Sequence, residues 1–539
     1  MKMGDVMQKT SKKPIIKVSE FIGNKITNIE ETTKLAFIFT VISTFICHMV
    51  FFMNRWANED DHHLFLAKSD MTNIGRWMNA KILGGDYLVP IILFIIVMIS
   101  LGLISVMVVK MFKQKNKLYI FITSLLISTF PVLALGFGYG FMIERYIMGM
   151  LCATFAVFIT DRYKYGAILG SISLAISIGY YQSYICISIA LIMLLIIKKI
   201  LENKETLKDY AIYIMKFLIM GILGYILYQI ILKLMCNYIG ISLLSYKGID
   251  KMGSLPPLNQ IPEYITRTYY DFINFFKGVK FIRPLEYGKI AQLFLCIINF
   301  VLLICIIIKN KVYRKKLSLM LLIVFVILIP LGFNMIDFIA WQSRTSSLNI
   351  YQFVFIFIIP FILLEMLEKD NFISRAGQNV TSIMGWICTV CGLLLIWHNT
   401  SVSNIYYLKI NDYYTSTVQL VNRIHSRIES TEGYTEDTPE MIGNKKGIYL
   451  NSTANRGYKN IFLYDQGLWT PFIGFSERPN KTDYKIHRLV SNILGIQLES
   501  LSAEEYYEIY NSEEYEQIEC WPSVNCIQFI NDILVLKIS

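Results

Sequence analysis

The sequence predicts a mainly α-helical fold: a polytopic transmembrane bundle of about 11 spans, followed by a small C-terminal α/β domain. Hydrophobic residues make up 54% of the 539 residues, and the mean hydropathy is +0.47. Charged residues make up only 17%, against about 25% in a soluble domain. Apolar runs long enough to cross a bilayer, about 20 residues, recur along the chain up to residue 398. Together these features indicate a chain that lies largely in lipid.

The N-terminal segment, residues 1–34, is polar and basic, and the apolar run after it is long and uninterrupted. A cleaved signal peptide would have a shorter apolar core followed by a small-residue cleavage site. We therefore expect a cytoplasmic N-terminal segment and a first span that stays in the protein.

Eight apolar segments have the length of complete spans, and they are residues 35–53, 88–109, 118–136, 211–232, 289–308, 317–336, 347–366 and 378–398. Three shorter ones are residues 144–160, 165–181 and 182–197. The last two form one stretch that would be roughly 48 Å long as a single helix, whereas the hydrocarbon core is about 30 Å thick. A break near Gly179-Tyr180-Tyr181-Gln182 is therefore predicted, which gives eleven spans.

Charge predicts the orientation of these spans. The segments that follow spans two, four, six, eight and ten are short and rich in Lys and Arg, as is typical of cytoplasmic loops. This pattern places the N-terminus inside and residues 400–539 outside. The segments on the other side, including the first outer loop (54–87), are longer and more mixed in charge. The net charge of +11 therefore reflects topology, and no basic-aromatic patch indicates a nucleic-acid partner.

The predicted domains are the N-terminal segment, a transmembrane catalytic domain (35–399) and an extracytoplasmic tail (400–539). In the tail, residues 411–429 and 485–497 have helical patterns, whereas 447–450 and 533–538 have strand patterns. Outside the spans, a further helix is expected around 261–277. Cys520 and Cys526 flank Trp521-Pro522, and a disulfide between them would fit an extracytoplasmic location. No cysteine spacing indicates a metal site.

The first outer loop carries three consecutive carboxylates, Glu59, Asp60 and Asp61. Carboxylates this close repel one another, which raises the pKa of at least one if the site is partly buried and suits a general base. Their oxygen atoms would also suit a divalent cation. The simpler interpretation is a solvated acidic cluster that keeps the loop outside the membrane.

Other charged and polar residues lie in the outer turns. Arg76 belongs to Gly75-Arg76-Trp77, Glu144 and Arg145 lie at the mouth of span four, Gln182 lies at the predicted break, and Arg344 lies between spans nine and ten. Arginine binds phosphate through two hydrogen bonds, so these turns would suit a lipid phosphate at the outer leaflet. The alternatives are interfacial anchoring for Arg76 and a satisfied ion pair for Glu144 with Arg145. No nucleotide-binding loop is present.

The order of these motifs resembles that of the bacterial glucosyl transferase II family, membrane glycosyltransferases of the GT-C type. The resemblance covers roughly residues 35–535. Its motifs are Asp60-Asp61, Gly75-Arg76-Trp77, Glu144-Arg145, Gly179-Tyr180-Tyr181-Gln182, Asn404-Ile405-Tyr406-Tyr407, Asn411-Asp412-Tyr413-Tyr414 and the stretch from Val524 to the C-terminal strand.

The resemblance implies transfer of a sugar, typically glucose, from a polyprenyl-phosphate sugar to a cell-surface polysaccharide, outside a bacterial cytoplasmic membrane. It implies an inverting displacement with Asp60 or Asp61 as the base and Glu59 beside them. The resemblance further implies that Arg145, Arg76 or Arg344, with Glu144 and Gln182 nearby, hold the phosphate and the sugar. No cofactor is implied with certainty, although a divalent cation would assist, and no metal ligands are defined.

Two other functions compete with this interpretation. A transporter or flippase of a lipid-linked glycan would favour inverted repeats and polar residues at the midplane, and the sequence shows neither. A non-catalytic scaffold that binds a partner through its tail would leave the clustered carboxylates and arginines unexplained.

Overall fold

The computed structural model describes residues 29–54, 56, 71–80, 89–245, 256–282, 284–342, 345–368, 375–443, 483, 487–488, 490–491, 494–496 and 501–538. Within these residues the chain is mainly helical, and nine helices are long and apolar enough to cross a membrane. This confirms the predicted mainly α class and indicates a multi-pass membrane protein.

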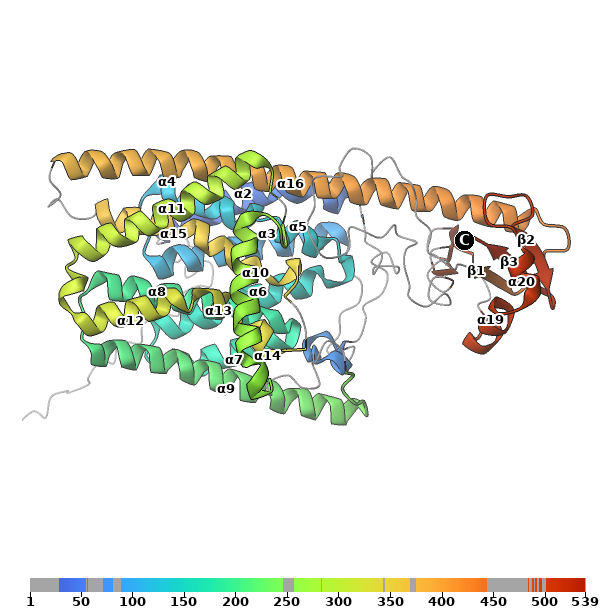
Figure 1. The fold of residues 1–539 in the computed structure, drawn as a ribbon, viewed down its shortest axis with the longest axis horizontal. Helices are drawn as coiled ribbons and strands as arrows, with labels where there is room; N and C mark the ends of the chain where they lie inside the picture. Colours follow the sequence, from blue (N-terminus) through green and yellow to red (C-terminus); the bar gives the residue numbers. More distant parts are fainter. Residues whose placement is uncertain are drawn as a thin grey trace, which may run out of the picture.

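The helices of the bundle run side by side along one axis (Figure 1). They are α2 (Glu31–Asn54), α3 (Pro90–Phe112), α4 (Lys117–Thr129), α5 (Val132–Phe137), α6 (Ile143–Arg162), α7 (Gly166–Tyr180), α8 (Ile185–Glu202), α9 (Leu207–Ile239), α11 (Glu286–Lys309), α12 (Lys316–Ile327), α13 (Ile329–Phe333), α14 (Ile336–Ile339), α15 (Val354–Glu368) and α16 (Arg375–Glu429). One more helix, α10 (Ile261–Lys277), lies across the bundle and matches the helix expected around 261–277.

The predicted spans all coincide with helices, but some are interrupted. The predicted break is confirmed: α7 ends at Tyr180, Tyr181 is extended (φ −157°, ψ 115°), and a short 3₁₀ turn leads into α8. Two predicted spans contain breaks: the helix over 118–136 is interrupted before Pro131, and the one over 317–336 is interrupted at Leu328, two residues before Pro330. Proline cannot continue a helix without losing a backbone hydrogen bond. α7 and α12 are shorter than a full span.

The basic connecting segments meet at one end of the bundle, on the left in Figure 1. We call this the basic end and define it by residues 113–116, 163–165, 203–206 and 310–315. Asn203 Nδ2 donates to the Asn310 carbonyl (2.8 Å), and the Lys115 amide donates to Glu365 Oε1 (2.6 Å). These bonds join the turns after α8 and α3 to the turn after α11 and the end of α15. The structure therefore places on one side the segments that the charge pattern grouped together.

The distal end, opposite the basic end, carries residues 71–80, the break after α7 and the turn around 345–350. Beyond it, α16 continues to a small C-terminal unit (Figure 1). Its sheet has the order β1-β3-β2. β1 (Glu440–Gly443) pairs in parallel with β3 (Ile533–Lys537), and β2 (Ile527–Ile530) pairs with β3 as a hairpin. Two short helices, α19 (Ala503–Tyr510) and α20 (Glu513–Gln517), pack beside this sheet.

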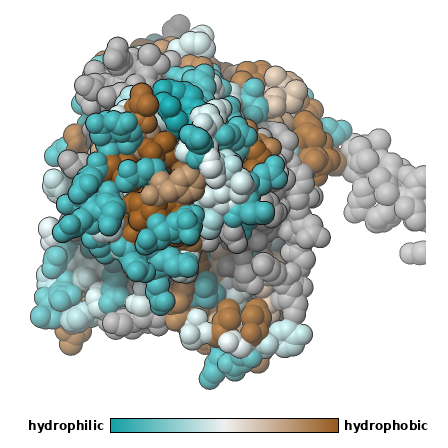
Figure 2. All heavy atoms as spheres, turned by 90° about the vertical axis from the view of Figure 1, so that its right-hand side faces the viewer, coloured by the Kyte–Doolittle hydropathy of each residue, from teal (hydrophilic) through white to brown (hydrophobic). Residues whose placement is uncertain are grey.

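Several predictions for the tail can be compared with this unit. The strand predicted at 533–538 is confirmed as β3, and the helix predicted at 411–429 is the end of α16. The strand predicted at 447–450 lies outside the described residues. Cys520 and Cys526 are free thiols in the structure. Seen from the end that carries this unit, hydrophilic side chains dominate the near face (Figure 2).

Candidate functional site

The segment 71–80 is held at the distal end by hydrogen bonds from neighbouring elements. Its two 3₁₀ turns, Thr72–Ile74 and Trp77–Asn79, are joined at Gly75, which adopts a left-handed conformation (φ 79°). Tyr228 of α9 donates its hydroxyl to the Gly75 carbonyl (2.9 Å), and Gln182 Nε2 donates to the Ile74 carbonyl (2.8 Å). The segment is therefore fixed between α9 and the break that separates α7 from α8.

Arg76 projects from the middle of this segment towards the break. Its Nε donates to Gln182 Oε1 (3.4 Å), and its guanidinium carbon lies 4.5 Å from the centre of the Tyr181 ring. Among the described residues, no carboxylate lies within ion-pair distance of Arg76. The structure thus brings together two predicted site residues that are 106 positions apart in the sequence, and it leaves guanidinium donors available for an anion.

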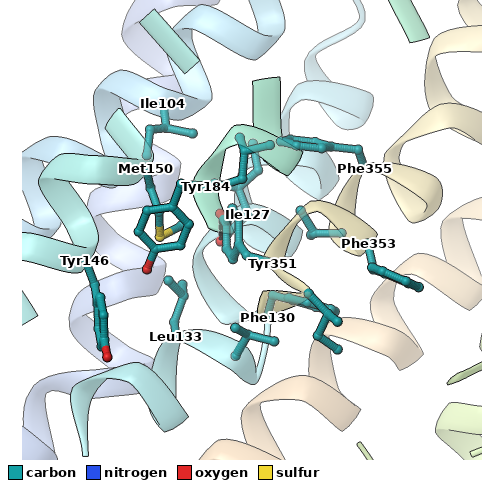
Figure 3. Close-up of a cluster of buried hydrophobic side chains, with 14 of the residues drawn as sticks. Ile104, Ile127, Phe130, Leu133, Tyr146, Met150, Tyr184, Tyr351, Phe353 and Phe355 are labelled. Atoms are coloured by element: carbon teal, nitrogen blue, oxygen red, sulfur yellow. Dashed lines mark hydrogen bonds between the residues drawn. The ribbon is translucent and has the colours of Figure 1, made fainter. Parts of the chain in front are cut away.

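A cluster of tyrosines lies under Arg76. The Tyr181 ring packs against Tyr146 at 5.0 Å and against Tyr184 at 5.1 Å, measured between ring centres. The Tyr181 hydroxyl donates to Asn349 Oδ1 (2.9 Å). Tyr146 and Tyr184 belong to a buried core that also includes Ile127, Met150 and Tyr351 (Figure 3). The floor of the site is therefore aromatic. The sequence showed tyrosines at the break but not their packing.

Close packing also holds the segment 71–80 against α7. Trp77 is buried beside Gly179, where a Cβ atom would lie 2.5 Å from Trp77 Cε2. Asn79 Nδ2 donates to the Tyr180 carbonyl (3.3 Å). Gly179 is thus needed so that α7 and the loop that carries Arg76 can approach each other closely.

Glu144 and Arg145 lie in the first turn of α6, where the helix N-terminus favours the carboxylate of Glu144. Arg145 is 6% exposed. Both side chains lie within electrostatic range of the Tyr180 hydroxyl. The four predicted site residues that the structure describes, Arg76, Glu144, Arg145 and Gln182, are therefore all arranged around the tyrosines of the break.

The other predicted site residues, Glu59, Asp60, Asp61 and Arg344, lie outside the described residues, so their roles stay predictions. On the chain leading to the three carboxylates, Trp56 is buried and its ring centre lies 6.5 Å from that of Tyr407 in α16. The chain therefore still contacts the bundle two residues beyond the end of α2.

A second polar cluster, which the sequence analysis did not assign to the site, joins α10 to α14. Arg267 Nη2 lies 3.7 Å from Asp337 Oδ1, which also accepts a hydrogen bond from the Thr345 amide (3.0 Å). Lys280 forms a close ion pair with Asp271. Burial raises the pKa of Asp337 above its ordinary value. The charged residues between positions 267 and 280 could have indicated this cluster in the sequence. The ion pair of Arg267 with Asp337 holds α10 against α14.

An apolar groove of about 390 Å³ lies between α8, α10, α11, α12 and α15. α11 packs on α10, α15 and α16, whereas α12 packs on α8, so the two helices diverge and the groove opens between them. Its lining is almost entirely hydrophobic and includes Phe272, Phe276, Cys296, Phe300, Phe333 and, towards the basic end, Lys198. Phe300 at the opening is 64% exposed. The groove has the size of a ligand pocket, typically about 300–1,000 Å³.

The groove is connected to the Arg76 site through one chain of contacts. Gln352 Nε2 donates both to the carbonyl of Phe333, which lines the groove (2.6 Å), and to the Asn349 carbonyl (2.8 Å). Asn349 in turn accepts the hydroxyl of Tyr181, whose ring lies under Arg76. Asn349 and Gln352 therefore connect the Arg76 site to the lining of the apolar groove.

No metal centre is evident in the part of the chain that the structure describes, since no group of three His, Cys, Asp or Glu side chains there is arranged to hold a metal ion. The three carboxylates of the first outer loop do not belong to that part.

One protein family matches the part of the chain that carries these features. A protein-family model described as glucosyl transferase GtrII matches residues 49–364, which is more than half of the chain. The matched range begins near the end of α2 and ends within α15, so it includes the Arg76 site and the lining of the groove. Searches of curated proteins and of solved structures found no significant match.

Proposed function

We propose, from the premise that this chain belongs to the glucosyl transferase GtrII family, that it transfers glucose from a polyprenyl-phosphate donor to a cell-surface polysaccharide. Membership of the family makes the protein a glucosyltransferase. The lipid-linked donor, the glycan acceptor and the location in a bacterial cytoplasmic membrane are our proposals. The observation that carries them is the half-buried Arg76, which has no carboxylate partner among the described residues and is linked through Asn349 and Gln352 to an apolar groove.

The donor phosphate fits Arg76 for a chemical reason. Guanidinium groups bind phosphate oxygens through two parallel hydrogen bonds, and the side chain is already oriented by Gln182 and by the Tyr181 ring. A prealigned cation of this kind stabilises charge that develops on a leaving group, and loss of one such donor typically costs about 10²–10³ in rate. Arg145, Glu144 and Arg344 are proposed to complete the binding of the phosphate and the sugar.

The isoprenoid chain of the donor fits the groove between α11 and α12. The groove offers an apolar lining to a hydrocarbon chain, and it opens where a lipid in the bilayer would enter laterally. The end of the groove at Phe333 is linked to the Arg76 site through Gln352 and Asn349. A nucleotide-linked sugar would not use such a groove, which favours a lipid-linked donor.

The proposed reaction is a single displacement that inverts the anomeric carbon. The acceptor hydroxyl gives its proton to Asp60 or Asp61, with Glu59 beside them, and its oxygen forms a bond to the anomeric carbon. The bond from that carbon to the phosphate oxygen breaks, and the electron pair leaves with the polyprenyl phosphate. Arg76 offsets the charge that the phosphate gains. No general acid is needed because the leaving phosphate is a stable anion.

The decisive experiment measures glucose transfer by purified protein supplied with polyprenyl-phosphate glucose and an acceptor glycan. Asp60→Asn, Asp61→Asn and Arg76→Ala should each be compared with the wild type. Asp209→Asn and Arg162→Ala, at the basic end, serve as matched controls. We expect at least one of the Asp60 and Asp61 variants to lose about 10²–10⁴ in rate, as removal of a general base does. Full activity in both the Asp60→Asn and the Asp61→Asn variant would contradict the proposed glucosyl transfer mechanism.

The proposed orientation places the basic end in the cytoplasm, because short loops rich in Lys and Arg stay there. A cysteine introduced at position 470, in a variant with Cys520→Ser because the native thiol is exposed, should react with a membrane-impermeant reagent added outside the cell. If the cysteine is labelled only after the membrane is opened, the orientation is the opposite of the proposed one, and the Arg76 site lies on the cytoplasmic side.

A further inference from the structure

The C-terminal unit contains a second, polar groove of about 310 Å³. It lies between the two short helices α19 and α20 on one side and the β2 strand with its hairpin turn on the other. Its lining combines carboxylates, amides, a hydroxyl and one aromatic ring, and includes Glu508, Ser512, Glu514, Gln528, Phe529 and Asn531. The volume lies at the lower end of the range of about 300–1,000 Å³ that is typical of ligand sites.

The walls of this groove are fixed. Ser502 caps α19 and Ser512 caps α20, each by accepting a backbone N–H through its side chain. Asn531 and the residue after it have left-handed backbones, which make a tight two-residue turn between β2 and β3. Lys537 Nζ donates to the carbonyl of Tyr515 (3.0 Å), so β3 is tied to α20. A ligand would therefore meet preformed walls, which lowers the entropic cost of binding.

The polar groups that line the groove have unused hydrogen-bonding capacity. Glu508, Glu514, Gln528 and Asn531 are exposed, and within the described residues their side chains make no hydrogen bond. Phe529 is 40% exposed beside them. Carboxylates accept hydrogen bonds from hydroxyl groups, and side-chain amides both donate and accept them. An aromatic ring next to such groups offers an apolar face to the C–H side of a sugar ring. This set suits a ligand rich in hydroxyl groups.

The charge of this unit narrows the class of ligand. Residues 501–538 contain eight carboxylates and one lysine, Lys537, which is 6% exposed. This acidic unit contrasts with a whole-chain charge of +11. The carboxylates around the groove disfavour an acidic polymer inside it. Among glycans, the groove therefore suits an uncharged chain better than an acidic one.

We propose that this groove binds an uncharged glycan chain, and that this glycan is the acceptor polymer of the transfer reaction. The second part rests on the proposed function. The groove lies beyond the distal end, the end that carries Arg76, because α16 leads from the bundle directly to this unit (Figure 1). A polysaccharide held by the groove is therefore presented to the side of the membrane on which the transfer site lies.

The test measures binding of full-length protein in lipid nanodiscs to uncharged polymers of glucose, mannose, galactose and N-acetylglucosamine. A polymer of galacturonic acid serves as the charged comparison. Gln528→Ala removes one exposed amide from the groove, and Gln517→Ala is the matched control on the same unit, outside the lining. We expect at least one uncharged polymer to bind, about tenfold weaker binding in Gln528→Ala, no change in Gln517→Ala, and no binding of the acidic polymer.

A second measurement separates this proposal from the proposed function. In the transfer assay, Gln528→Ala should raise the KM for a long glycan acceptor about tenfold and leave transfer to a single-sugar acceptor unchanged. The groove proposal is overturned if no uncharged polymer binds, if Gln517→Ala has the same effect, or if a polycation such as polylysine binds in place of glycans. Glycan binding that depends on Gln528, in a protein that transfers no glucose, would refute the proposed function and leave the groove assignment standing.

Discussion

Replacing Gly179 by alanine tests whether the position of Arg76 depends on packing at the break. The added Cβ would lie 2.5 Å from Trp77 Cε2 and 2.9 Å from Trp77 Nε1. Carbon atoms pack best at about 3.5–4.0 Å, so the indole must move by about 1 Å. Trp77 follows Arg76 directly, so the guanidinium moves with it. A misplacement of about 1 Å can cost about 10²-fold in rate, even when the mutation is far from the reacting atoms.

The assay compares glucose transfer by wild-type, Gly179→Ala and Gly221→Ala protein, together with the melting temperature of each. Gly221 is a membrane-embedded glycine of α9 with no atom within 4 Å of its Cβ position, so its replacement should leave transfer unchanged. For Gly179→Ala we expect a 10- to 100-fold loss of transfer and an overpacking cost of about 1–3 kcal/mol. Transfer within twofold of the wild type in Gly179→Ala would refute the reasoning that Trp77 positions Arg76.

Two further predictions concern the groove and the C-terminal unit. Cys296→Trp should fill the apolar groove and raise the KM for a long isoprenoid donor more than for a short one. Cys305→Trp on the same helix should not, and equal effects on both donors would argue against a tail site. Burial raises the pKa of Glu440 and of Asp483 to about 7. The folded unit therefore holds these two protons more tightly than the unfolded chain does, so their contribution to stability is present in acid and is lost as the pH rises to about 7. Burial lowers the pKa of His487 to about 4, and this change opposes part of that loss. Limited proteolysis of the full-length protein should show protection at about pH 5 that is reduced at about pH 8, and Glu440→Gln should flatten this dependence by roughly 3 kcal/mol. A pH dependence that is unchanged in Glu440→Gln would contradict this cause.

Much of the bundle follows from length and composition, because the bilayer requires a fixed span of apolar residues. The break before Gln182 was predictable for the same reason: one helix over that stretch would exceed the thickness of the hydrocarbon core. The interruptions near Pro131 and Pro330 could also have been found, since proline marks them in the sequence. β1 was missed because its sequence, Glu-Met-Ile-Gly, begins and ends with residue types that are depleted in strands.

The candidate site was only partly predictable. Arg76 and Gln182 were singled out separately, as polar residues in turns between apolar runs. Their contact depends on how α7, α8 and α9 pack, and no local pattern carries that information. The partnership of Tyr181 with Asn349 was missed for the same reason. The role of Asp60 and Asp61 as the base stays a prediction.

The continuity of α16 has a consequence for the pattern of glucose on the polymer. The part of this helix between Ile410, which packs beside Gly138 of the bundle, and Arg423, which lies over the Trp521 ring of the C-terminal unit, is roughly 20 Å long at 1.5 Å per residue. It has no internal break. A continuous helix holds the C-terminal unit at a fixed distance from the bundle. If a polymer is gripped at the far end of the helix, the sugar unit that reaches Arg76 is set by the length of α16. Removing about one heptad from the helix would shorten it by roughly 10 Å with little rotation, and the spacing between branches would shorten with it.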